Sequence, residues 1–381
     1  MSPACNEEFG MSDLVYGVIG CGMMGQEHLR NIALIDGARV GGIYEPDPVM
    51  RAAAAALAPG AVMVDSIAAL LALADLTCLL IVSPNFRHLE QLEEIGARRP
   101  LPVLVEKPLF TDAAQVARLA AFRDTYAAPV WVAMEYRYMP PVALLVERAE
   151  AETGGIKMLT IREHRFPFLE KVGDWNRFNR NTGGTLVEKC CHFFDLMRLI
   201  LRDDPVRVMA SGGQAVNHRA EVYDGQPSDI WDHAYVIVDF ARGGRAMLEL
   251  CMFAEGARYQ EEISVVGPLG KIECQVPGPG RFWPAHLGAA PVPLVTVSPR
   301  DPAGPRVLEV PVDPALLAAG DHNGSTYYQH ARFARMVGGQ GDVEVTLNDG
   351  WWAVAMGMAA QMSAASGQAI DLRAAGLAPV V

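Results

Sequence analysis

The sequence predicts an α/β protein in which a doubly wound parallel sheet precedes an α+β domain with a mostly antiparallel open sheet. In the first third of the chain, short apolar strand-like runs alternate with helical runs, which is typical of a parallel sheet covered on both faces. After Met134 the strand-like runs follow one another without intervening helices, which indicates antiparallel pairing. These observations divide the chain into residues 1–134 and residues 135–381.

The strands expected in the first part are apolar runs that end at glycine, proline or polar residues. They occupy residues 14–19, 39–44, 76–82, 103–105 and 130–134. Helical segments are expected between them, beginning near residue 27 and then at residues 52–57, 88–95 and 111–126.

In the second part, residues 135–141 are expected to form a crossover loop, and a helix follows to about residue 152. The expected strands lie at residues 156–165, 206–215, 233–240, 245–253, 259–266 and 271–276. Helices that include residues 185–202 would cover one face of this sheet. A final helix pair at 325–337 and 348–366 follows an expected proline- and glycine-rich loop region at 277–320.

Composition limits the classes of partner. The chain has 381 residues, 51% hydrophobic and 20% charged, which is enough for about two domains. A formal charge of -12 argues against nucleic acid, because phosphate neutralisation needs clustered Lys and Arg. No apolar run reaches the ~20 residues that a membrane span needs.

Residues 1–13 lack signal-peptide features, and seven cysteines without framework spacing fit a reducing cytoplasm. We therefore expect a cytoplasmic protein, and residues 1–10 to be dispensable for its fold.

A glycine-rich turn follows the first expected strand. Gly20, Gly22 and Gly25 form a GxGxxG pattern that also contains Met23 and Met24, and helical signals follow at once. In such a turn the first glycine makes the bend, the second lets the backbone approach a pyrophosphate, and the third lets helix pack on strand. Because the pattern has a strand before it and a helix after it, it predicts a dinucleotide-binding site.

The second strand ends at Glu45, 20 residues beyond Gly25. At this distance an acidic residue binds the ribose 2′-hydroxyl of NAD and repels the 2′-phosphate of NADP, so NAD is the expected cofactor. Asp47 is the reserve candidate for the same role. The alternative is that Glu45 is a solvated carboxylate at a strand end.

Ligands bind beyond the carboxyl ends of parallel strands, so the loops after residues 82 and 105 should face the cofactor. The candidates there are Ser83, Pro84, Asn85, His88, Glu106 and Lys107. Pro108 restricts Lys107 to extended or turn geometry and favours a cis peptide. A lysine held in this way suits contact with a reacting oxygen, whereas the alternative is a loop lysine paired with Glu106.

The helix expected at 185–202 carries Glu188 and His192 four residues apart, on nearly the same face. A carboxylate beside an imidazole can fix its tautomer and tune its basicity. The alternative is an ordinary surface pair. Helix geometry argues against a zinc site formed by Glu188, Cys190, Cys191 and His192, because successive helix residues point ~100° apart. No metal is therefore expected.

The order of these motifs resembles that of the glucose-fructose oxidoreductase/inositol dehydrogenase/rhizopine catabolism (Gfo/Idh/MocA) family over nearly the whole chain. The resemblance rests on the motifs at residues 20–25, 83–88, 106–108, 137–140, 183–195 and 321–324. Members are typically NAD(P)-dependent oxidoreductases of sugars and cyclitols. The resemblance implies that Lys107 and His192 act in catalysis. Glu188 stands where the family has aspartate, and Cys190 where glycine is usual.

The resemblance implies hydride transfer between nicotinamide and a secondary alcohol or ketone of a sugar, cyclitol or related polyol. His192 would take the hydroxyl proton, Glu188 would orient His192, and Lys107 would stabilise alkoxide character. Arg137 is expected to contact both cofactor and substrate. The side chains expected to bind substrate are Arg137, Trp175, Arg177, Asn181, Asp195, His322 and Tyr328. For Asp195, a hydrogen bond within the fold is an equal alternative.

Two further readings belong to the same fold. One is a glycosidase or epimerase that oxidises and re-reduces a retained NAD, and the other is a dinucleotide-sensing regulator without turnover. The presence of both Lys107 and His192 favours an enzyme. We expect a small-molecule substrate and a homo-oligomer, a dimer or tetramer, that associates through the open sheet.

Overall fold

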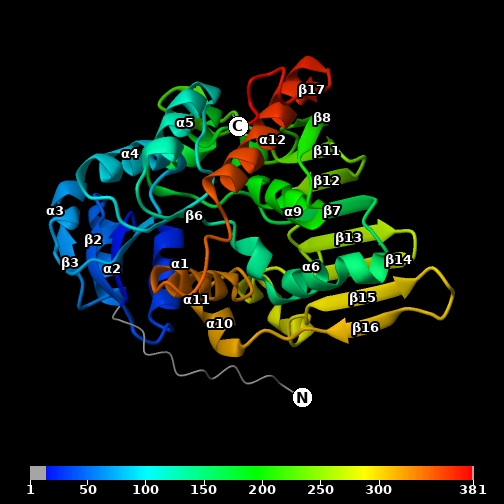
Figure 1. Ribbon diagram of the computed structural model, residues 1–381, viewed down its shortest axis with the longest axis horizontal. Coiled ribbons are helices and arrows are strands. Elements are labelled where there is room, and N and C mark those ends of the chain that lie inside the picture. Colours follow the sequence, from blue (N-terminus) through cyan, green and yellow to red (C-terminus); the bar gives the residue numbers. More distant parts are fainter. Residues whose placement is uncertain (1–13, 380–381) are drawn as a thin grey trace.

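The computed structural model describes residues 14–379 and contains two sheets that lie side by side (Figure 1). Residues 1–10, expected to be dispensable, lie outside the described residues. A parallel sheet with its helices forms one part, and a larger sheet with helices on one face forms the other. The predicted fold class is therefore confirmed. The division between residues 134 and 135 stays a prediction.

The first sheet has six parallel strands in the order β3-β2-β1-β4-β5-β6. Its strands are β1 (Leu14–Ile19), β2 (Ala38–Tyr44), β3 (Val62–Val64), β4 (Cys78–Ile81), β5 (Val103–Val105) and β6 (Val130–Val132). The strand order reverses between β1 and β4, and ligands bind at such a switch point. The sequence did not predict β3, since three residues are too few to show a strand period.

Short loops connect these strands to helices. The helices are α1 (Met23–Ile32), α2 (Pro48–Leu57), α3 (Ile67–Leu71), α4 (His88–Arg98) and α5 (Val116–Thr125). Short 3₁₀ turns at η1 (Asn85–Arg87) and η2 (Ala113–Gln115) precede α4 and α5. Strands β1, β4, β5 and β6 are buried completely, because helices cover both of their faces.

The second sheet has nine strands in the order β16-β15-β14-β13-β7-β12-β11-β8-β17. They are β7 (Met158–His164), β8 (Pro205–Gly213), β11 (His233–Phe240), β12 (Arg245–Cys251), β13 (Glu261–Gly267), β14 (Gly270–Val276), β15 (Leu294–Pro299), β16 (Arg306–Glu309) and β17 (Ile370–Asp371). Within it only β7 and β12 pair in parallel, as the expected mostly antiparallel sheet requires. A separate hairpin joins β9 (Val222–Tyr223) to β10 (Gln226–Pro227).

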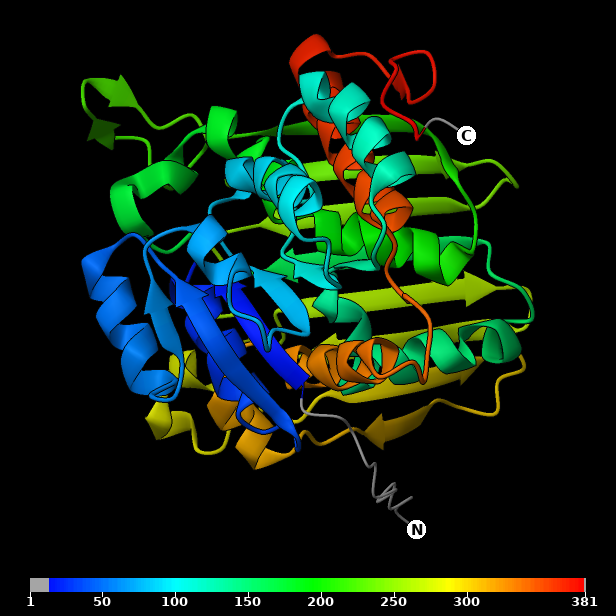
Figure 2. The same cartoon turned by 60° about the vertical axis from the view of Figure 1, so that its left-hand side comes forward.

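Helices cover one face of the second sheet, and the other face is open (Figure 2). The helices of this part are α6 (Pro140–Thr153), α7 (Asn179–Thr182), α8 (Thr185–Glu188), α9 (Cys191–Leu201), α10 (Pro314–Ala319), α11 (Ser325–Val337) and α12 (Leu347–Ser366). Short 3₁₀ turns lie at η3 (Glu135–Tyr138), η4 (Val172–Arg177), η5 (Gly280–Phe282) and η6 (Ala285–Leu287). Along β12, Ala246, Leu248 and Leu250 are buried under the helices, whereas Arg245 and Glu249 point to the open face.

Two expectations about this part were wrong. Residues 277–320 contain β15, β16 and α10, because proline is tolerated at the ends of short strands near a sheet edge. The helix expected at 185–202 is interrupted, with a turn at Lys189 and Cys190 between α8 and α9. This break changes which side chains meet in the site.

Among residues 14–379, no helix combines the length and the apolar character that a bilayer-spanning segment requires.

Candidate active site

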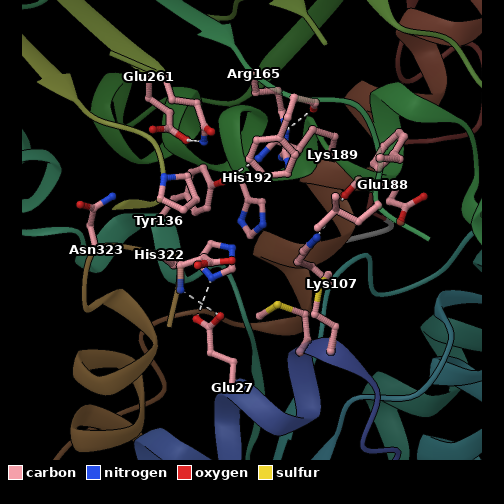
Figure 3. A pocket seen from close by; sticks show the side chains of 18 of the residues that line it. Glu27, Lys107, Tyr136, Arg165, Glu188, Lys189, His192, Glu261, His322 and Asn323 are labelled. Atoms are coloured by element: carbon pink, nitrogen blue, oxygen red, sulfur yellow. Dashed lines mark hydrogen bonds and ion pairs between the residues drawn. The ribbon is translucent and has the colours of Figure 1, made fainter. Parts of the chain in front are cut away.

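A cavity of about 110 Å³ lies between the two parts of the molecule, beyond the carboxyl end of β5 (Figure 3). The first part contributes α1 and the loop after β5, and the second contributes α9 and the loops after β6 and β7. The polar and charged lining residues are Glu27, Lys107, Tyr136, Arg165, Lys171, Glu188, Lys189, His192, Gln260, Glu261, Arg281, Asp321, His322 and Asn323. Lys107 and His192, predicted from motifs 85 residues apart in the sequence, therefore face the same space.

Lys107 enters the cavity from the loop after β5, and its peptide bond to Pro108 is cis. Its Nζ donates to the backbone oxygen of Glu188 at 3.3 Å. Burial opposes the charged form, but nearby acidic groups, with Cys191 and Glu106 foremost, outweigh it and raise the pKa of Lys107. The side chain is therefore an ammonium that can stabilise negative charge on an oxygen.

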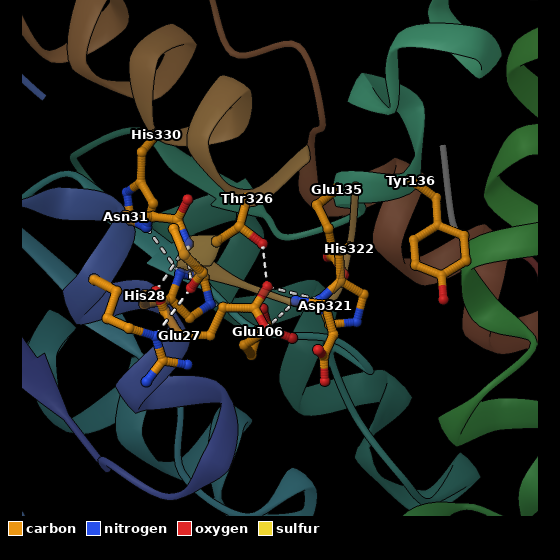
Figure 4. Close-up of polar contacts among 12 residues, drawn as sticks. Glu27, His28, Asn31, Glu106, Glu135, Tyr136, Asp321, His322, Thr326 and His330 are labelled. Atoms are coloured by element: carbon orange, nitrogen blue, oxygen red, sulfur yellow. Dashed lines mark hydrogen bonds and ion pairs between the residues drawn. The ribbon is translucent and has the colours of Figure 1, made fainter. Parts of the chain in front are cut away.

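Glu106 does not pair with the Lys107 ammonium, because it belongs to a buried chain of hydrogen bonds (Figure 4). His28 Nε2 lies 3.0 Å from Glu106 Oε1, and His28 Nδ1 lies 2.8 Å from His330 Nε2. His330 Nδ1 lies 3.1 Å from the hydroxyl of Tyr16. Glu106 also accepts the backbone N–H of Lys107 at 3.1 Å. The chain thus links β1, α1 and α11 to the backbone that carries Lys107.

His192 is the second residue of α9, and its imidazole is 2% exposed. The ring stacks on Tyr136 with centroids 4.1 Å apart and an interplanar angle of 8°. Burial and the positive charges of Lys107 and Lys189 hold the pKa of His192 well below its usual range. The imidazole is therefore neutral at physiological pH and can accept a proton.

The carboxylate next to His192 is not the one expected. His192 Nε2 lies 3.7 Å from Glu135 Oε1, whereas in the part of the chain that the structure describes no hydrogen bond or ion pair joins Glu188 to His192. A turn interrupts the helix between α8 and α9, and Glu188 instead approaches Lys171 Nζ at 3.9 Å. The helical spacing used to pair Glu188 with His192 therefore does not apply.

Sequence reasoning missed Glu135 although a signal was available. It follows the buried strand β6, and residues beyond the carboxyl ends of parallel strands face the ligand site. Burial, and then the charge of Glu106, raise the pKa of Glu135 to about 7. Neither of its carboxylate oxygens has a hydrogen-bond partner among the described residues.

A second buried acid, Glu27, anchors His322 at the cavity (Figure 4). Glu27 accepts hydrogen bonds from His322 Nδ1 at 2.7 Å, from the Thr326 hydroxyl at 2.9 Å and from the N–H of Asp321 at 3.1 Å. Burial disfavours the carboxylate, but these partners outweigh it and lower the pKa of Glu27 to about 2. Burial likewise opposes the imidazolium, and Glu27 raises the pKa of His322 to about 9.

The glycine-rich turn fits a dinucleotide pyrophosphate. Gly20 has a φ of 87°, and a Cβ there would lie 2.7 Å from the backbone of Ser83, so only glycine suits the bend. A Cβ on Gly25 would lie 2.8 Å from the oxygen of Gly20, whereas one on Gly22 would have nothing within 4 Å. Gly22 thus leaves open space in front of the N-terminus of α1, which has no side-chain cap. Met23 and Met24 line the cavity just beyond it.

Glu45 is buried at the end of β2 and turns toward this loop. It accepts hydrogen bonds from the N–H of Cys21 and, at 2.8 Å, from that of Asp47. The carboxylate is therefore held beside the glycine turn, as a ribose-binding residue requires, and the solvated alternative does not apply. Asp47 caps α2 by accepting from the N–H groups of Val49 and Met50, so the reserve candidate has a structural role.

The loop after β4 is linked to the loop after β5. His88 is buried, with Nδ1 2.8 Å from the oxygen of Pro108 and Nε2 3.0 Å from that of Ser83. The hydroxyl of Ser83 donates to Gln91, and within residues 14–379 the amide nitrogen of Asn85 has no partner. His88 therefore fixes the two loops, and Asn85 keeps a donor for a ligand. Pro84 precedes the turn η1.

Of the residues expected to bind substrate, only His322 lines the cavity. Arg137 and Asp195 form a bidentate ion pair with each other, which is the structural alternative considered for Asp195. Arg137 is not among the residues that line this cavity. The amide of Asn181 donates to the oxygen of Trp175 at 2.9 Å.

The remaining two candidates also lie outside the cavity. Arg177 is 2% exposed and forms an ion pair with Glu221 at 3.1 Å. Tyr328 packs against Tyr327, with ring centroids 5.5 Å apart. Trp175 lies next to the cavity all the same, because the Nζ of the lining residue Lys171 is 4.8 Å from the centroid of its ring.

Lys189 is a further cavity residue that the sequence did not single out. Its Nζ lies 2.8 Å from Glu163 and donates to the hydroxyl of Tyr136 at 2.6 Å. It points inward because it lies in the turn between α8 and α9. Among residues 14–379, no three His, Cys, Asp or Glu side chains form a group that could hold a metal ion.

A nucleotide-binding turn beside a buried lysine and a neutral histidine defines a NAD-binding oxidoreductase. Two family models match the chain: "Oxidoreductase family, NAD-binding Rossmann fold" over residues 14–134 and "Oxidoreductase family, C-terminal alpha/beta domain" over residues 149–372. The chain belongs to the Gfo/Idh/MocA family of oxidoreductases, as the motifs predicted.

Relatives and solved structures agree with this assignment. The chain is 28% identical over 264 residues to inositol 2-dehydrogenase of Rhizobium meliloti, covering 68% of this chain and 75% of the relative. It resembles the structure of a putative myo-inositol dehydrogenase from Sinorhizobium meliloti with a TM-score of 0.72, 21% identity and 94% and 99% of the two chains covered. A levoglucosan dehydrogenase in complex with NADH and levoglucosan matches with a TM-score of 0.76 and 20% identity, over 94% and 99%. At these identities the structures support the fold.

Proposed function

We propose that this oxidoreductase transfers a hydride between NAD and a secondary alcohol or ketone of a sugar, cyclitol or related polyol. The observation that carries the proposal is the presence of Lys107 and His192 in one buried cavity that adjoins the glycine turn. The similarity to inositol 2-dehydrogenases supports a polyol substrate. The buried carboxylate of Glu45 supports NAD over NADP.

NAD, when bound, supplies the hydride acceptor or donor. The turn at residues 20–25 and the N-terminus of α1 would hold its phosphates, and Glu45 its ribose. His192, neutral in the free protein, accepts the substrate's hydroxyl proton during oxidation. Lys107 stabilises the negative charge that develops on the same oxygen. In reduction the same two groups supply the proton and the electrostatic stabilisation.

Glu135 takes the place that the sequence suggested for Glu188. When ionised, it stabilises the imidazolium that forms as His192 accepts a proton. Glu188 contributes its backbone oxygen to Lys107 and its carboxylate to the neighbourhood of Lys171.

The experiment is a panel of inositols, aldoses and other polyols with NAD or NADP, followed by nicotinamide absorbance. Lys107→Ala and His192→Ala should each lower kcat by roughly 10²-fold or more, with NAD affinity close to wild type. Tyr328→Phe, outside the cavity, is a matched control. Near-normal turnover in either alanine variant removes that residue from the mechanism. Product formation without net nicotinamide reduction identifies the NAD-retaining alternative, and a regulator would show no turnover.

We further propose a cytoplasmic homo-oligomer. Large apolar side chains such as Met158, Tyr235 and Val307 are exposed on strands of the second sheet, which supports association through it. The cysteines of residues 14–379 are free thiols, as expected in a reducing compartment. A monomer by light scattering at micromolar concentration would argue against the assembly.

A further inference from the structure

The cavity has an uneven distribution of charge. In two of its ion pairs, one cation has one carboxylate at hydrogen-bond distance: His322 with Glu27 and Arg281 with Asp321. The rest of the lining carries the carboxyl groups of Glu188 and Glu261 and four cationic groups, which we call the cationic wall: Lys107, Arg165, Lys171 and Lys189. Arg165 and Lys171 belong to the segment that follows β7, and their side chains are 14% and 26% exposed. They can therefore be reached from the cavity.

The carboxylates near the cationic wall are shared between cations. Glu163 lies 2.8 Å from Lys189 Nζ and 3.5 Å from Arg165 Nη1, so it serves two cations. Glu188 lies 3.9 Å from Lys171 Nζ, beyond hydrogen-bond distance, and among the described residues its Oε2 has no hydrogen-bond partner. Neither Arg165 nor Lys171 thus has a close carboxylate of its own.

A third acid near the cationic wall, Glu261, supplies only part of a negative charge. Burial, and then the charge of Glu163, raise the pKa of Glu261 to about 7, so it is only partly ionised at neutral pH. Burial and neighbouring cations also lower the pKa of Lys189. The same two causes act on Lys171, although Glu188 opposes them. Arg165 and Lys171 thus remain without a carboxylate at hydrogen-bond distance, which is costly for partly buried cations, and a bound anion would relieve that cost.

Cofactor phosphates do not account for this charge. The turn that fits them lies at residues 20–25 in the first part, whereas Arg165, Lys171 and Lys189 belong to the second. A neutral polyol does not account for Arg165 and Lys171 either, since its hydroxyls carry no charge that would pair with these two cations.

We infer that the substrate is an anionic polyol whose carboxylate lies against Arg165 and Lys171 while its secondary alcohol lies between Lys107 and His192. This assignment rests on the proposed function and adds a substrate class, the aldonates and uronates. A guanidinium matches the planar carboxylate geometrically, and the aromatic ring of Phe166, 4.3 Å from the Arg165 guanidinium, holds that guanidinium in place.

The test compares aldonates and hexuronates with their carboxamides, which keep every hydroxyl and lose the charge. The wild type should oxidise one or more acids with a kcat/KM roughly tenfold or more above that of the matched carboxamide. Arg165→Gln and Lys171→Gln should remove that preference, so that the acid and its carboxamide give similar kcat/KM values. Arg162→Gln is the control, because Arg162 lies on β7 and pairs with Glu262 across the open face. Melting temperatures would check that each variant is folded.

A second readout separates this inference from the proposed function. Calorimetry on the NADH-loaded protein should show tighter binding of the acid than of its carboxamide, and the difference should vanish in Arg165→Gln. Neutral polyols turned over as fast as the acids or faster, at rates that neither glutamine variant changes, would overturn the inference of an anionic substrate. The proposed dehydrogenase function would still hold in that case. If no polyol is turned over, the proposed function fails. If calorimetry then shows equal affinity for the acid and its carboxamide, the anion site is overturned as well. A preference for sugar phosphates over carboxylates would also overturn it.

Discussion

The partner of His192 is open to a sharp test, Glu135→Gln. The substitution keeps the shape of the side chain and removes its charge 3.7 Å from His192 Nε2. At an effective dielectric constant of about 20, a full ion pair at this distance is worth about 4 kcal/mol. If half of this stabilisation is present when the proton is half transferred, the barrier rises by about 2 kcal/mol, which lowers kcat/KM about 30-fold.

The pH dependence of this variant follows from the direction of each pKa shift. The pKa of Glu135 is raised to about 7, so it is ionised above this pH and loses its charge as the pH falls through about 7. The pKa of His192 is lowered well below 6.5, so the imidazole remains neutral there. Wild-type kcat/KM should therefore fall as the pH drops through about 7, as a property of the coupled pair. In Glu135→Gln this limb should move to lower pH, because only His192 then titrates.

The assay is a pH profile of kcat/KM, which reports groups of the free enzyme. Glu188→Gln is the matched control, since it makes the same chemical change in the same cavity but not beside His192. Its acid limb should stay at the wild-type position. The reasoning is refuted if Glu135→Gln keeps both the limb near pH 7 and a plateau within about threefold of the wild type.

Two further predictions concern cofactor choice and stability. Wild-type kcat/KM should be higher with NAD than with NADP. Glu45→Gln should lower the ratio of the two kcat/KM values, because it removes the like-charge repulsion of the 2′-phosphate. A wild-type preference for NADP would show that Glu45 has another role. Glu27→Gln should lower the free energy of unfolding at pH 7 by roughly 1.5–3 kcal/mol, because Glu27 accepts charged hydrogen bonds from His322. The contribution of Glu27, with a pKa lowered to about 2, is lost as pH falls from about 4.5 through 2, and that of His322 is lost as pH rises from about 6.5 through 9. Denaturant unfolding at pH 2, 7 and 10 measures the loss of stability on the acid side and on the alkaline side. Equal stability of Glu27→Gln and wild type at pH 7 would contradict a stabilising ion pair between Glu27 and His322.

Local signals were sufficient for the first part of the fold. Strands β1 and β4 are buried apolar runs, and Gly20 and Gly25 occupy positions that a side chain could not. The strand β11 and the helix α11 were also predicted with their observed bounds. What failed was the assumption of a continuous helix at 185–202, since the turn at Lys189 and Cys190 carries neither proline nor glycine.

The candidate site could be predicted only where a motif contained its residues. Lys107 and His192 belong to recognisable patterns, whereas Arg165 and Lys171 follow a strand end that resembles any other polar loop. Arg137 and Asp195 show the converse, because these two residues with suitable chemistry form an ion pair with each other. No local pattern distinguishes a charged side chain that binds a ligand from one that binds its neighbour.

The break between α8 and α9 links these observations. A Cβ on Gly357 of α12 would lie 2.5 Å from the oxygen of Leu186, so the glycine lets α12 pack directly on α8. This contact holds α8 where the backbone oxygen of Glu188 receives Lys107. Lys189 in the turn lies beside Glu163, α9 begins after it, and His192 of α9 faces Glu135 in the loop after β6. A continuous helix would have paired His192 with a residue of its own segment, whereas the broken one makes the base depend on the junction of the two sheets.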